Sequence, residues 1–445
     1  MTTTDSNRTD SNRTDRLAHL PVRADEDPFT VAVGGFYRRW LNLIDDIDLL
    51  SETVSTLTDT VDEEWVPVWS EVARRHVDKA EEALASGDRE AARRLFLQAK
   101  TYYSIGRYPS PYHAGTAFAP AEMGPLKAEC YENYLECFRR ASELSDDRPE
   151  TVTIAYGDHT AAGYLYLPPR ASEAQPVAGV LVMCGADMFK EDREHYARGA
   201  VGAGLAALVV DGPGTGQTTF PHAPESIVAW QSALDLLGSR AEIAADRLGA
   251  FGVSRGGLWV LRLAALDDRV RAVASIAPAG VGYEGSPEER AAWRGFRNAR
   301  SKYWFGPRDQ KPSTPRLITE EDQQREFLTW SLKHNRLLDK LQVPALLING
   351  KHDHLSPIGE VYLALESGPP TGRVARVYPD DGHIAARSEH QWGPATWRWM
   401  REQLRGSRSH ENSPSAKHVQ EPSAQETGAG ASAEPRPNKL GPAPR

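Results

Sequence analysis

A short glycine-containing sequence, Gly252-Val253-Ser254-Arg255-Gly256, constrains the fold of this 445-residue chain more than any other feature. The run before it, 247–251, has the pattern of a strand, and the run after it, 258–266, has the pattern of a helix. In a G-x-S-x-G sequence at such a junction, the serine occupies a sharp, strained turn, and the glycines leave room for neighbouring backbone. The pattern therefore predicts that Ser254 is a nucleophile exposed at the end of a strand.

Two later runs supply candidate partners for this serine. The apolar run 343–350 has the pattern of a buried parallel strand and is followed by Asp353, and the run 373–378 is followed by His383. An open parallel sheet keeps its site at the carboxyl ends of its strands, and the order Ser, Asp, His is typical of one hydrolase fold. We therefore expect a triad of Ser254, Asp353 and His383. The alternative is a chance motif with an ordinary surface Asp and His.

Each residue of this set has a chemical role. His383 would take the proton of the serine hydroxyl as general base, and Asp353 would orient the imidazole and stabilise its cation. His352 and His354 flank Asp353 and raise the alternative of a metal site. Because no further ligands have a suitable spacing, we expect no metal.

The negative charge on an attacked carbonyl oxygen needs backbone donors. The first is expected to be the N–H of Arg255, which follows the nucleophile. The second should come from the loop after the strand-like run 177–183, which continues as Cys184-Gly185-Ala186. The position after the glycine predicts Ala186 as this second donor.

A second glycine-rich turn, Asp211-Gly212-Pro213-Gly214-Thr215-Gly216, raises the alternative of a nucleotide cofactor. Its spacing is G-x-G-x-G where a dinucleotide site has G-x-G-x-x-G, and Pro213 removes a backbone donor. We expect a tight loop bordering the active site and no cofactor.

The chain is long enough for one large α/β domain and one helical domain. Unstructured tails are expected at 1–27 and at 407–445, since neither segment is able to bury a core. Apolar residues at three- and four-residue spacing predict a helical domain at 28–146. The catalytic domain is expected at 147–406, with a mostly helical insertion at about 281–340 that forms a cap.

Aromatic residues concentrate in two places outside the expected sheet. Tyr108 and Tyr112 lie in a proline-broken segment of the helical region, and Trp304 lies in the insertion. Such rings suit the walls of a substrate pocket, and Glu284 could be an additional acid there. The alternatives are that the rings only pack the protein core and that Glu284 is a solvated surface residue.

Composition limits the kinds of molecule that this protein is expected to bind. A formal net charge of −9 and the lack of a basic stripe argue against nucleic acid. No apolar run has the length needed to cross a bilayer, the N-terminus is polar, and three cysteines suit a reducing compartment, so we expect a cytoplasmic protein with no membrane partner. The expected partner is a small-molecule substrate, and a homodimer is left open.

Several motifs together resemble the FrsA-like α/β-hydrolases, a group that includes 2,6-dihydroxypseudooxynicotine hydrolase and fungal heptaketide hydrolases. The resemblance spans residues 28–405. It is carried by Cys-Gly-Ala-Asp-Met-Phe-Lys-Glu from 184, Asp-Gly-Pro-Gly-Thr-Gly from 211, Gly-Val-Ser-Arg-Gly-Gly from 252 and Asn-Gly-Lys-His-Asp-His-Leu-Ser-Pro from 349. Cys184 departs from the family, in which a glycine is common at that position.

This resemblance implies an α/β-hydrolase fold with a mostly parallel, doubly wound sheet, an N-terminal helical domain and a helical cap. It implies a serine hydrolase that cleaves a C–C bond beside a ketone, or an ester, in an aromatic or polyketide-like molecule. One alternative is an acyltransferase or an elimination or cyclisation enzyme of natural-product biosynthesis with the same triad. Another is a non-catalytic ligand-binding module, which would require a defective triad.

Overall fold

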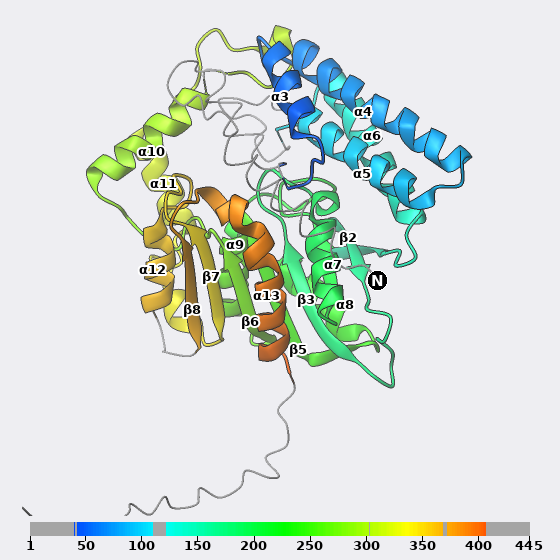
Figure 1. Ribbon diagram of the computed structural model, residues 1–445. Coiled ribbons are helices and arrows are strands. Elements are labelled where there is room, and N and C mark those ends of the chain that lie inside the picture. The colour runs from blue at the N-terminus through cyan, green and yellow to red at the C-terminus, as the bar shows by residue number, and fades with distance from the viewer. Residues whose placement is uncertain (1–39, 41, 110–121, 302, 368–371, 406–445) are drawn as a thin grey trace, which may run out of the picture. The chain divides into compact units, whose positions relative to one another are not determined.

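The computed structural model describes residues 40, 42–109, 122–301, 303–367 and 372–405 (Figure 1). The expected tails at 1–27 and 407–445 and the expected pocket residue Tyr112 lie outside these residues.

A single sheet organises the C-terminal two thirds of the described chain. Its eight strands lie in the order β1-β2-β4-β3-β5-β6-β7-β8 (Figure 1). They are β1 (Glu150–Tyr156), β2 (His159–Tyr166), β3 (Val177–Met183), β4 (Ala206–Val210), β5 (Ile243–Val253), β6 (Val270–Ile276), β7 (Ala345–Gly350) and β8 (Arg373–Tyr378). The pairs β1–β2 and β2–β4 are antiparallel, and every other pair is parallel. The prediction of a mostly parallel sheet is confirmed.

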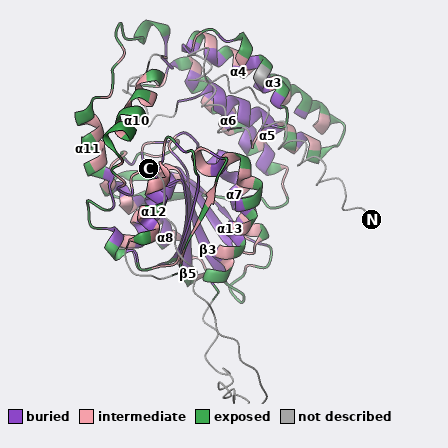
Figure 2. Cartoon of the chain, turned by 60° about the vertical axis from the view of Figure 1, so that its left-hand side comes forward, coloured by how far each residue is buried: buried purple, intermediate pink, exposed green. Residues whose placement is uncertain are grey.

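Helices cover both faces of the sheet, because its central strands are apolar on both sides. On one face, α8 (Ile227–Ser239), α9 (Arg255–Leu266) and α12 (Ile358–Glu366) pack on side chains such as Leu181 and Leu208. On the other face, α7 (Glu194–Gly202) and α13 (Glu389–Gln403) pack on the alternate side chains of the same strands. Figure 2 shows the strands buried and the outer helix faces exposed. This is the expected doubly wound arrangement.

In the described part of the chain, the helices that precede the sheet are α3 (Ile47–Thr56), α4 (Asp62–Ala85), α5 (Arg89–Gly106) and α6 (Pro125–Glu143). Asp88 begins α5 by accepting a hydrogen bond from the N–H of Ala91, and Pro125 occupies the first turn of α6, where its missing N–H does no harm. Their facing sides bury a core rich in rings, including Trp65, Trp69 and Tyr102. In the described ranges, no helix is both long and apolar enough to cross a membrane.

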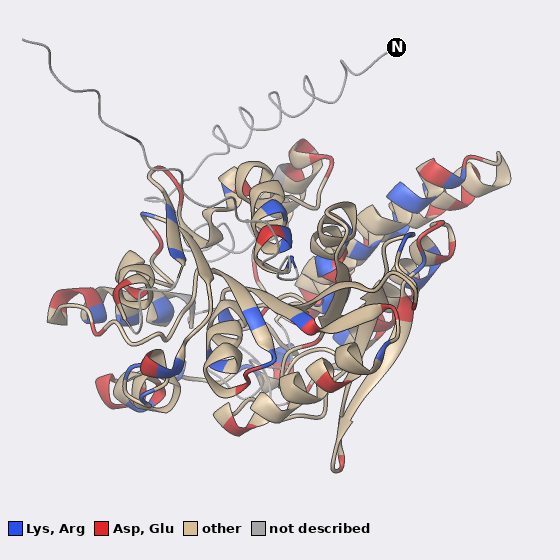
Figure 3. Cartoon of the chain, turned by 90° about the horizontal axis from the view of Figure 1, so that it is seen from below, with Lys and Arg blue, Asp and Glu red and all other residues tan. Residues whose placement is uncertain are grey.

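The inserted segment, which we define as residues 281–340, separates β6 from β7. It contains the helices α10 (Pro287–Arg300) and α11 (Glu320–Trp330) and the short 3₁₀ turns η4 (Arg308–Gln310) and η5 (Leu338–Lys340). Both long helices begin with a capping box in which a hydroxyl side chain and an acidic side chain satisfy the first free N–H groups. Figure 3 shows acidic and basic residues mixed along the outer helices.

The remaining short 3₁₀ turns lie close to the candidate site or its loops. They are η2 (Lys190–Arg193), η3 (Pro224–Ser226) and η6 (His383–Ser388).

Candidate active site

The turn between β5 and α9 presents Ser254 in a strained conformation. Its φ is 58° and its ψ is −117°, in a region that L-residues other than glycine rarely adopt. A side chain at Gly252 would overlap the carbonyl oxygen of Gly256, and one at Gly256 would overlap that of Met183. Both motif glycines are therefore required by close backbone packing, and the serine N–H is fixed by donation to the Ile276 oxygen at 2.7 Å.

The structure brings Ser254, His383 and Asp353 together. The serine Oγ lies 3.0 Å from Nε2 of His383, and Nδ1 of the same ring lies 2.7 Å from Oδ2 of Asp353. With the imidazole proton on Nδ1, the ring donates to the carboxylate and accepts from the serine hydroxyl. The three residues stand at the carboxyl ends of β5, β7 and β8, three parallel strands of the sheet.

Asp353 accepts hydrogen bonds from other groups besides His383. Oδ1 accepts from the N–H of Leu355 at 2.7 Å and from that of Ser356 at 3.0 Å, and Oδ2 accepts from Nδ2 of Asn349 at 2.9 Å. Burial acts to raise the pKa of Asp353, but the charge of His383 and these hydrogen bonds outweigh it and hold the pKa below its ordinary value. The carboxylate is thus ionised and fixed in orientation. Sequence reasoning missed the roles of Asn349 and Ser356.

The segments that carry the two expected oxyanion donors, Ala186 and Arg255, both adjoin Ser254. A side chain added at Gly185 would lie 3.5 Å from the Cβ of Ser254, so the Cys184–Ala186 turn runs directly beside Ser254. Arg255 is the first residue of α9, and the N–H groups of a helix N-terminus face developing negative charge favourably.

The side chain of Arg255 joins the nucleophile turn to the inserted segment. Its Nη2 lies 3.3 Å from Oε1 of Glu326, whose other oxygen pairs with Arg297 at 2.7 Å. The Arg255 guanidinium also lies over the ring of Trp330, 4.8 Å from its centroid. Helix α11 is therefore packed against the residue that follows Ser254.

A buried ionic cluster fixes the chain just beyond the proposed oxyanion turn. Asp192 accepts hydrogen bonds from Lys100 at 3.2 Å, Ser104 at 2.9 Å and Arg107 at 3.0 Å, all on or at the end of α5, and from the N–H of Phe189 at 3.2 Å. The side chains of Asp192 and Arg107 are fully buried. Burial acts to raise the pKa of Asp192, but the two cations and the hydrogen bonds hold it below its ordinary value. Sequence reasoning did not identify this cluster.

Lys190 and Glu191, which precede Asp192, also have buried partners. Lys190 Nζ pairs with Asp211 at 2.9 Å and with Glu191 at 2.7 Å, and all three side chains are buried. Glu191 in turn accepts from the hydroxyl of Tyr134 on α6 at 3.1 Å. The glycine-rich loop that begins at Asp211 thus holds the Lys190 turn, which connects the sheet to the N-terminal helices.

The described pocket candidates do not share one environment. Tyr108 is buried against Phe305, with ring centroids 5.4 Å apart, inside the core of the N-terminal helices. Trp304 is also buried, and its Nε1 donates to the Pro307 oxygen at 2.8 Å. Glu284 is exposed. A pocket role for these residues stays a prediction.

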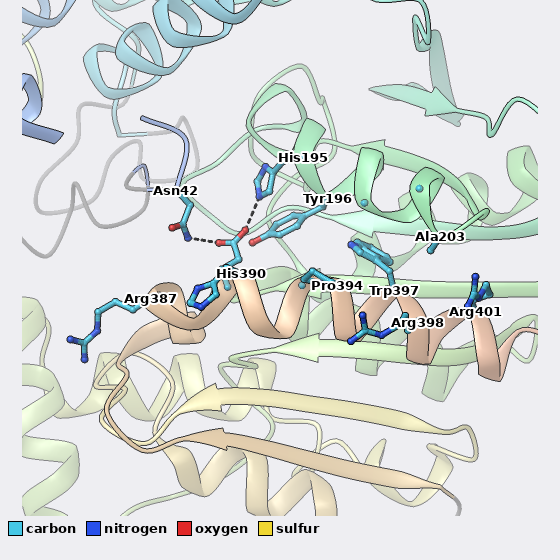
Figure 4. Close-up of a pocket in the computed structure, with 14 residues that line it drawn as sticks. Asn42, His195, Tyr196, Ala203, Arg387, His390, Pro394, Trp397, Arg398 and Arg401 are labelled. Carbon is cyan, nitrogen blue, oxygen red and sulfur yellow. Dashed lines mark hydrogen bonds and ion pairs between the residues drawn. The ribbon is translucent and has the colours of Figure 1, made fainter. Parts of the chain in front are cut away.

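A hollow of about 570 Å³ lies between α7 and α13 (Figure 4). At one end, the carboxylate of Glu389 accepts from Nδ2 of Asn42 at 2.6 Å and pairs with Nε2 of His195 at 3.0 Å. None of the three triad candidates lines this hollow, so its size gives no reason to place the reaction there.

Comparison with known sequences shows a match to a family model. The model, described as esterase FrsA-like, matches residues 48–283, which is more than half of the chain. A fungal protein named alpha/beta hydrolase xenA, from Xenoacremonium sinensis, is 31% identical over 247 residues, covering 52% of this chain and 55% of that protein. Hydrolase pyiE from Pyricularia grisea is 30% identical over 249 residues, covering 52% of this chain and 54% of that protein. The chain thus spans about half the length of the curated relatives that it matches.

Solved structures share the fold. The structure of 2,6-dihydroxy-pseudo-oxynicotine hydrolase superposes with a TM-score of 0.63 and 18% identity, covering 83% of this chain and 95% of that one. The structure titled AbyA5 wildtype gives a TM-score of 0.60 and 17% identity, with 82% and 94% coverage. The expectation of an α/β-hydrolase fold is confirmed.

Proposed function

Because this chain belongs to the FrsA-like esterase family and is a hydrolase of the α/β fold, we propose that it cleaves an acyl bond with Ser254 as nucleophile. The bond is a C–C bond beside a ketone, or an ester, in an aromatic or polyketide-like small molecule. The observation that carries the proposal is the hydrogen-bonded chain from Ser254 through His383 to Asp353, with steps of 3.0 and 2.7 Å.

The geometry supports a two-step reaction. Oγ of Ser254 bonds to the carbonyl carbon while its proton passes to Nε2 of His383, and the buried Asp353 carboxylate stabilises the imidazolium. The oxyanion faces the N–H groups of Ala186 and Arg255. When the tetrahedral adduct collapses, the leaving group takes the proton from Nε2. An ester expels an alcohol, and a ketone expels a carbanion that is protonated at carbon. Water then attacks the acyl-enzyme with His383 as base and releases a carboxylic acid.

Two observations favour a substrate of this class over a small aliphatic ester. The name of one structural neighbour states that it hydrolyses an oxynicotine, and the curated relatives include several fungal hydrolases. The ring of Trp330 lies against Arg255, next to the nucleophile. Trp330 is 6% exposed, so a planar substrate would contact only that exposed part of the ring. The alternative proton donor to an expelled carbanion is Glu284, and in that case Nε2 of His383 passes its proton to solvent before water attacks the acyl-enzyme.

Labelling with a fluorophosphonate tests the nucleophile. Wild type should be labelled and Ser254→Ala should not, whereas Ser239→Ala, which removes an exposed serine at the end of α8, should label normally. Labelling of the Ser254→Ala protein would refute the assignment.

Turnover of an aromatic 1,3-diketone and of the matched aromatic ester in ¹⁸O-water tests the reaction. Hydrolysis places ¹⁸O in the carboxylic acid product. Formation of product without ¹⁸O would instead support acyl transfer or elimination by the same triad.

A further inference from the structure

Glu360, in the first turn of α12, holds the start of the inserted segment. It is 6% exposed. Its Oε1 accepts from the N–H of Gly280 at 3.1 Å, and its Oε2 accepts from those of Gly282 at 2.8 Å and Tyr283 at 3.0 Å. A single carboxylate thus organises the chain where it leaves β6. No sequence pattern points to this role.

The end of α11 returns to the same place. The N–H of Leu332 donates to the Gly280 oxygen at 3.2 Å, and that of Lys333 donates to the Val281 oxygen at 2.9 Å. A side chain at Gly282 would collide with Lys333, which shows how closely these two stretches pack. The two ends of the inserted stretch are therefore hydrogen-bonded to each other, and Glu360 holds the first of them.

The loop that leads into the helix of Glu360 carries Asp353. Ser356 donates its N–H to Asp353 at 3.0 Å and its hydroxyl to the Pro278 oxygen at 2.5 Å. Pro278 and the residues bound by Glu360 belong to one loop after β6. At the other end of the inserted segment, Glu326 on α11 contacts Arg255. The Glu326–Arg255 pair thus joins the inserted segment to the Ser254 turn, and Ser356 joins the loop after β6 to Asp353.

We propose that Glu360 is a positioning residue that keeps the inserted segment closed against the Ser254 turn, and that it thereby favours substrates large enough to contact that segment. This inference rests on the proposed hydrolase function. Glu360 does not enter the reaction itself. It acts through the three N–H groups that it holds.

The charge of Glu360 makes this closure sensitive to pH. Burial raises the pKa of Glu360 to about 7, although the N–H groups of Tyr283, Gly282 and Gly280 act to lower it. Two ionisable side chains lie on the stretches 280–283 and 331–333 that pack near Glu360. They are Tyr283, whose ring lies against Gly359, and Lys333. Neither forms an ion pair with Glu360. Because opening would hydrate the carboxylate and return its pKa toward 4.5, the closed form binds the proton more tightly. The stabilisation of the closed form by this proton is therefore largest below about pH 4.5 and is lost as the pH rises to about 7.

Hydrogen exchange measured by mass spectrometry tests closure without any need for activity. Exchange of peptides covering 280–283 and 320–333, corrected for the intrinsic rate, is compared at about pH 6 and about pH 8, one unit either side of the titration. Wild type should be less protected at the higher pH. Glu360→Gln, which stays neutral, should lose this difference, and Glu360→Ala should be less protected at both. Glu366→Gln, an exposed acid on the same helix, should match wild type.

Activity on a short p-nitrophenyl ester and on a bulky aromatic ester supplies the second readout. Glu360→Ala should lower kcat/KM for the bulky ester by about tenfold or more, the equivalent of one lost charge-assisted hydrogen bond, and change the short ester little. Wild-type protection together with a wild-type ratio of the two esters in Glu360→Ala would overturn the inference. If that variant does not fold, a pH difference that persists in Glu360→Gln would overturn it. Turnover that survives Ser254→Ala would instead overturn the proposed function and leave the exchange result standing.

Discussion

Replacing Asp192 by asparagine should destabilise the protein far more than a similar change on the surface. The carboxylate is fully buried and accepts hydrogen bonds from Lys100, Ser104, Arg107 and the N–H of Phe189. The asparagine keeps the shape and one acceptor, but it leaves two buried cations without a counter-charge. Breaking a buried pair in this way costs about 3–5 kcal/mol in the free energy of unfolding.

Thermal and denaturant unfolding, followed by circular dichroism, would measure this loss. A destabilisation of that size should lower Tm by roughly 3–6 °C in a chain of this length. Asp78→Asn is the matched control, because Asp78 pairs with Arg74 at 2.9 Å on the exposed side of α4, with both side chains 57% exposed. Surface pairs of this kind contribute at most about 1 kcal/mol.

The same substitution should also reduce turnover. Asp192 accepts a hydrogen bond from the N–H of Phe189. Phe189 follows Ala186 by three residues, and Ala186 lies in the turn beside Ser254. A looser turn should lower kcat and leave KM nearly unchanged, since only the transition state uses the oxyanion donors. Equal unfolding free energies for Asp192→Asn and Asp78→Asn would refute this reasoning, because the cluster would then contribute no more than an exposed pair.

Four further substitutions test the site and its surroundings. Ser254→Ala should lower kcat by on the order of 10⁶ without loss of Tm, and a chromogenic ester assay beside a melting curve checks both. His383→Ala should be about as damaging, whereas Asp353→Asn should lower kcat by about 10⁴, and the opposite ranking would show that another histidine is the base. Tyr108→Ala should reduce stability by about 3–5 kcal/mol and impair short and bulky esters alike, because the ring fills the core of the N-terminal helices. A loss of activity on bulky esters alone would instead support a role for Tyr108 in the substrate pocket.

The convergence of Ser254, Asp353 and His383 could be predicted because each follows a run with the pattern of a parallel strand. Parallel strands bring their carboxyl ends to one edge of a sheet. Local sequence patterns that predict the strands therefore also predict that these distant residues lie close together. The strands, the N-terminal helices and the double layer of helices could be predicted for the same reason, since their periodicities are local.

The buried acids could not be predicted in this way. Asp192 and Glu360 lie in segments whose charges would ordinarily face water, and their partners come from α5 and from the loop after β6. The pairing depends on how distant elements dock. The same holds for the rings of Tyr108 and Phe305, which meet from separate parts of the chain and fill a core.

The strained backbone of Ser254, with φ at 58°, has a consequence for descendants of this sequence in which catalytic activity is no longer under selection. A non-glycine residue in such a conformation holds about 1–3 kcal/mol of strain, a sizeable share of the roughly 5–15 kcal/mol that keeps a typical protein folded. A lineage released from selection for turnover gains stability by replacing this serine with glycine, whose lack of a Cβ removes the strain. Serine at position 254 would therefore be lost early in any such lineage, and its retention across otherwise divergent descendants would mark the continued use of its hydroxyl.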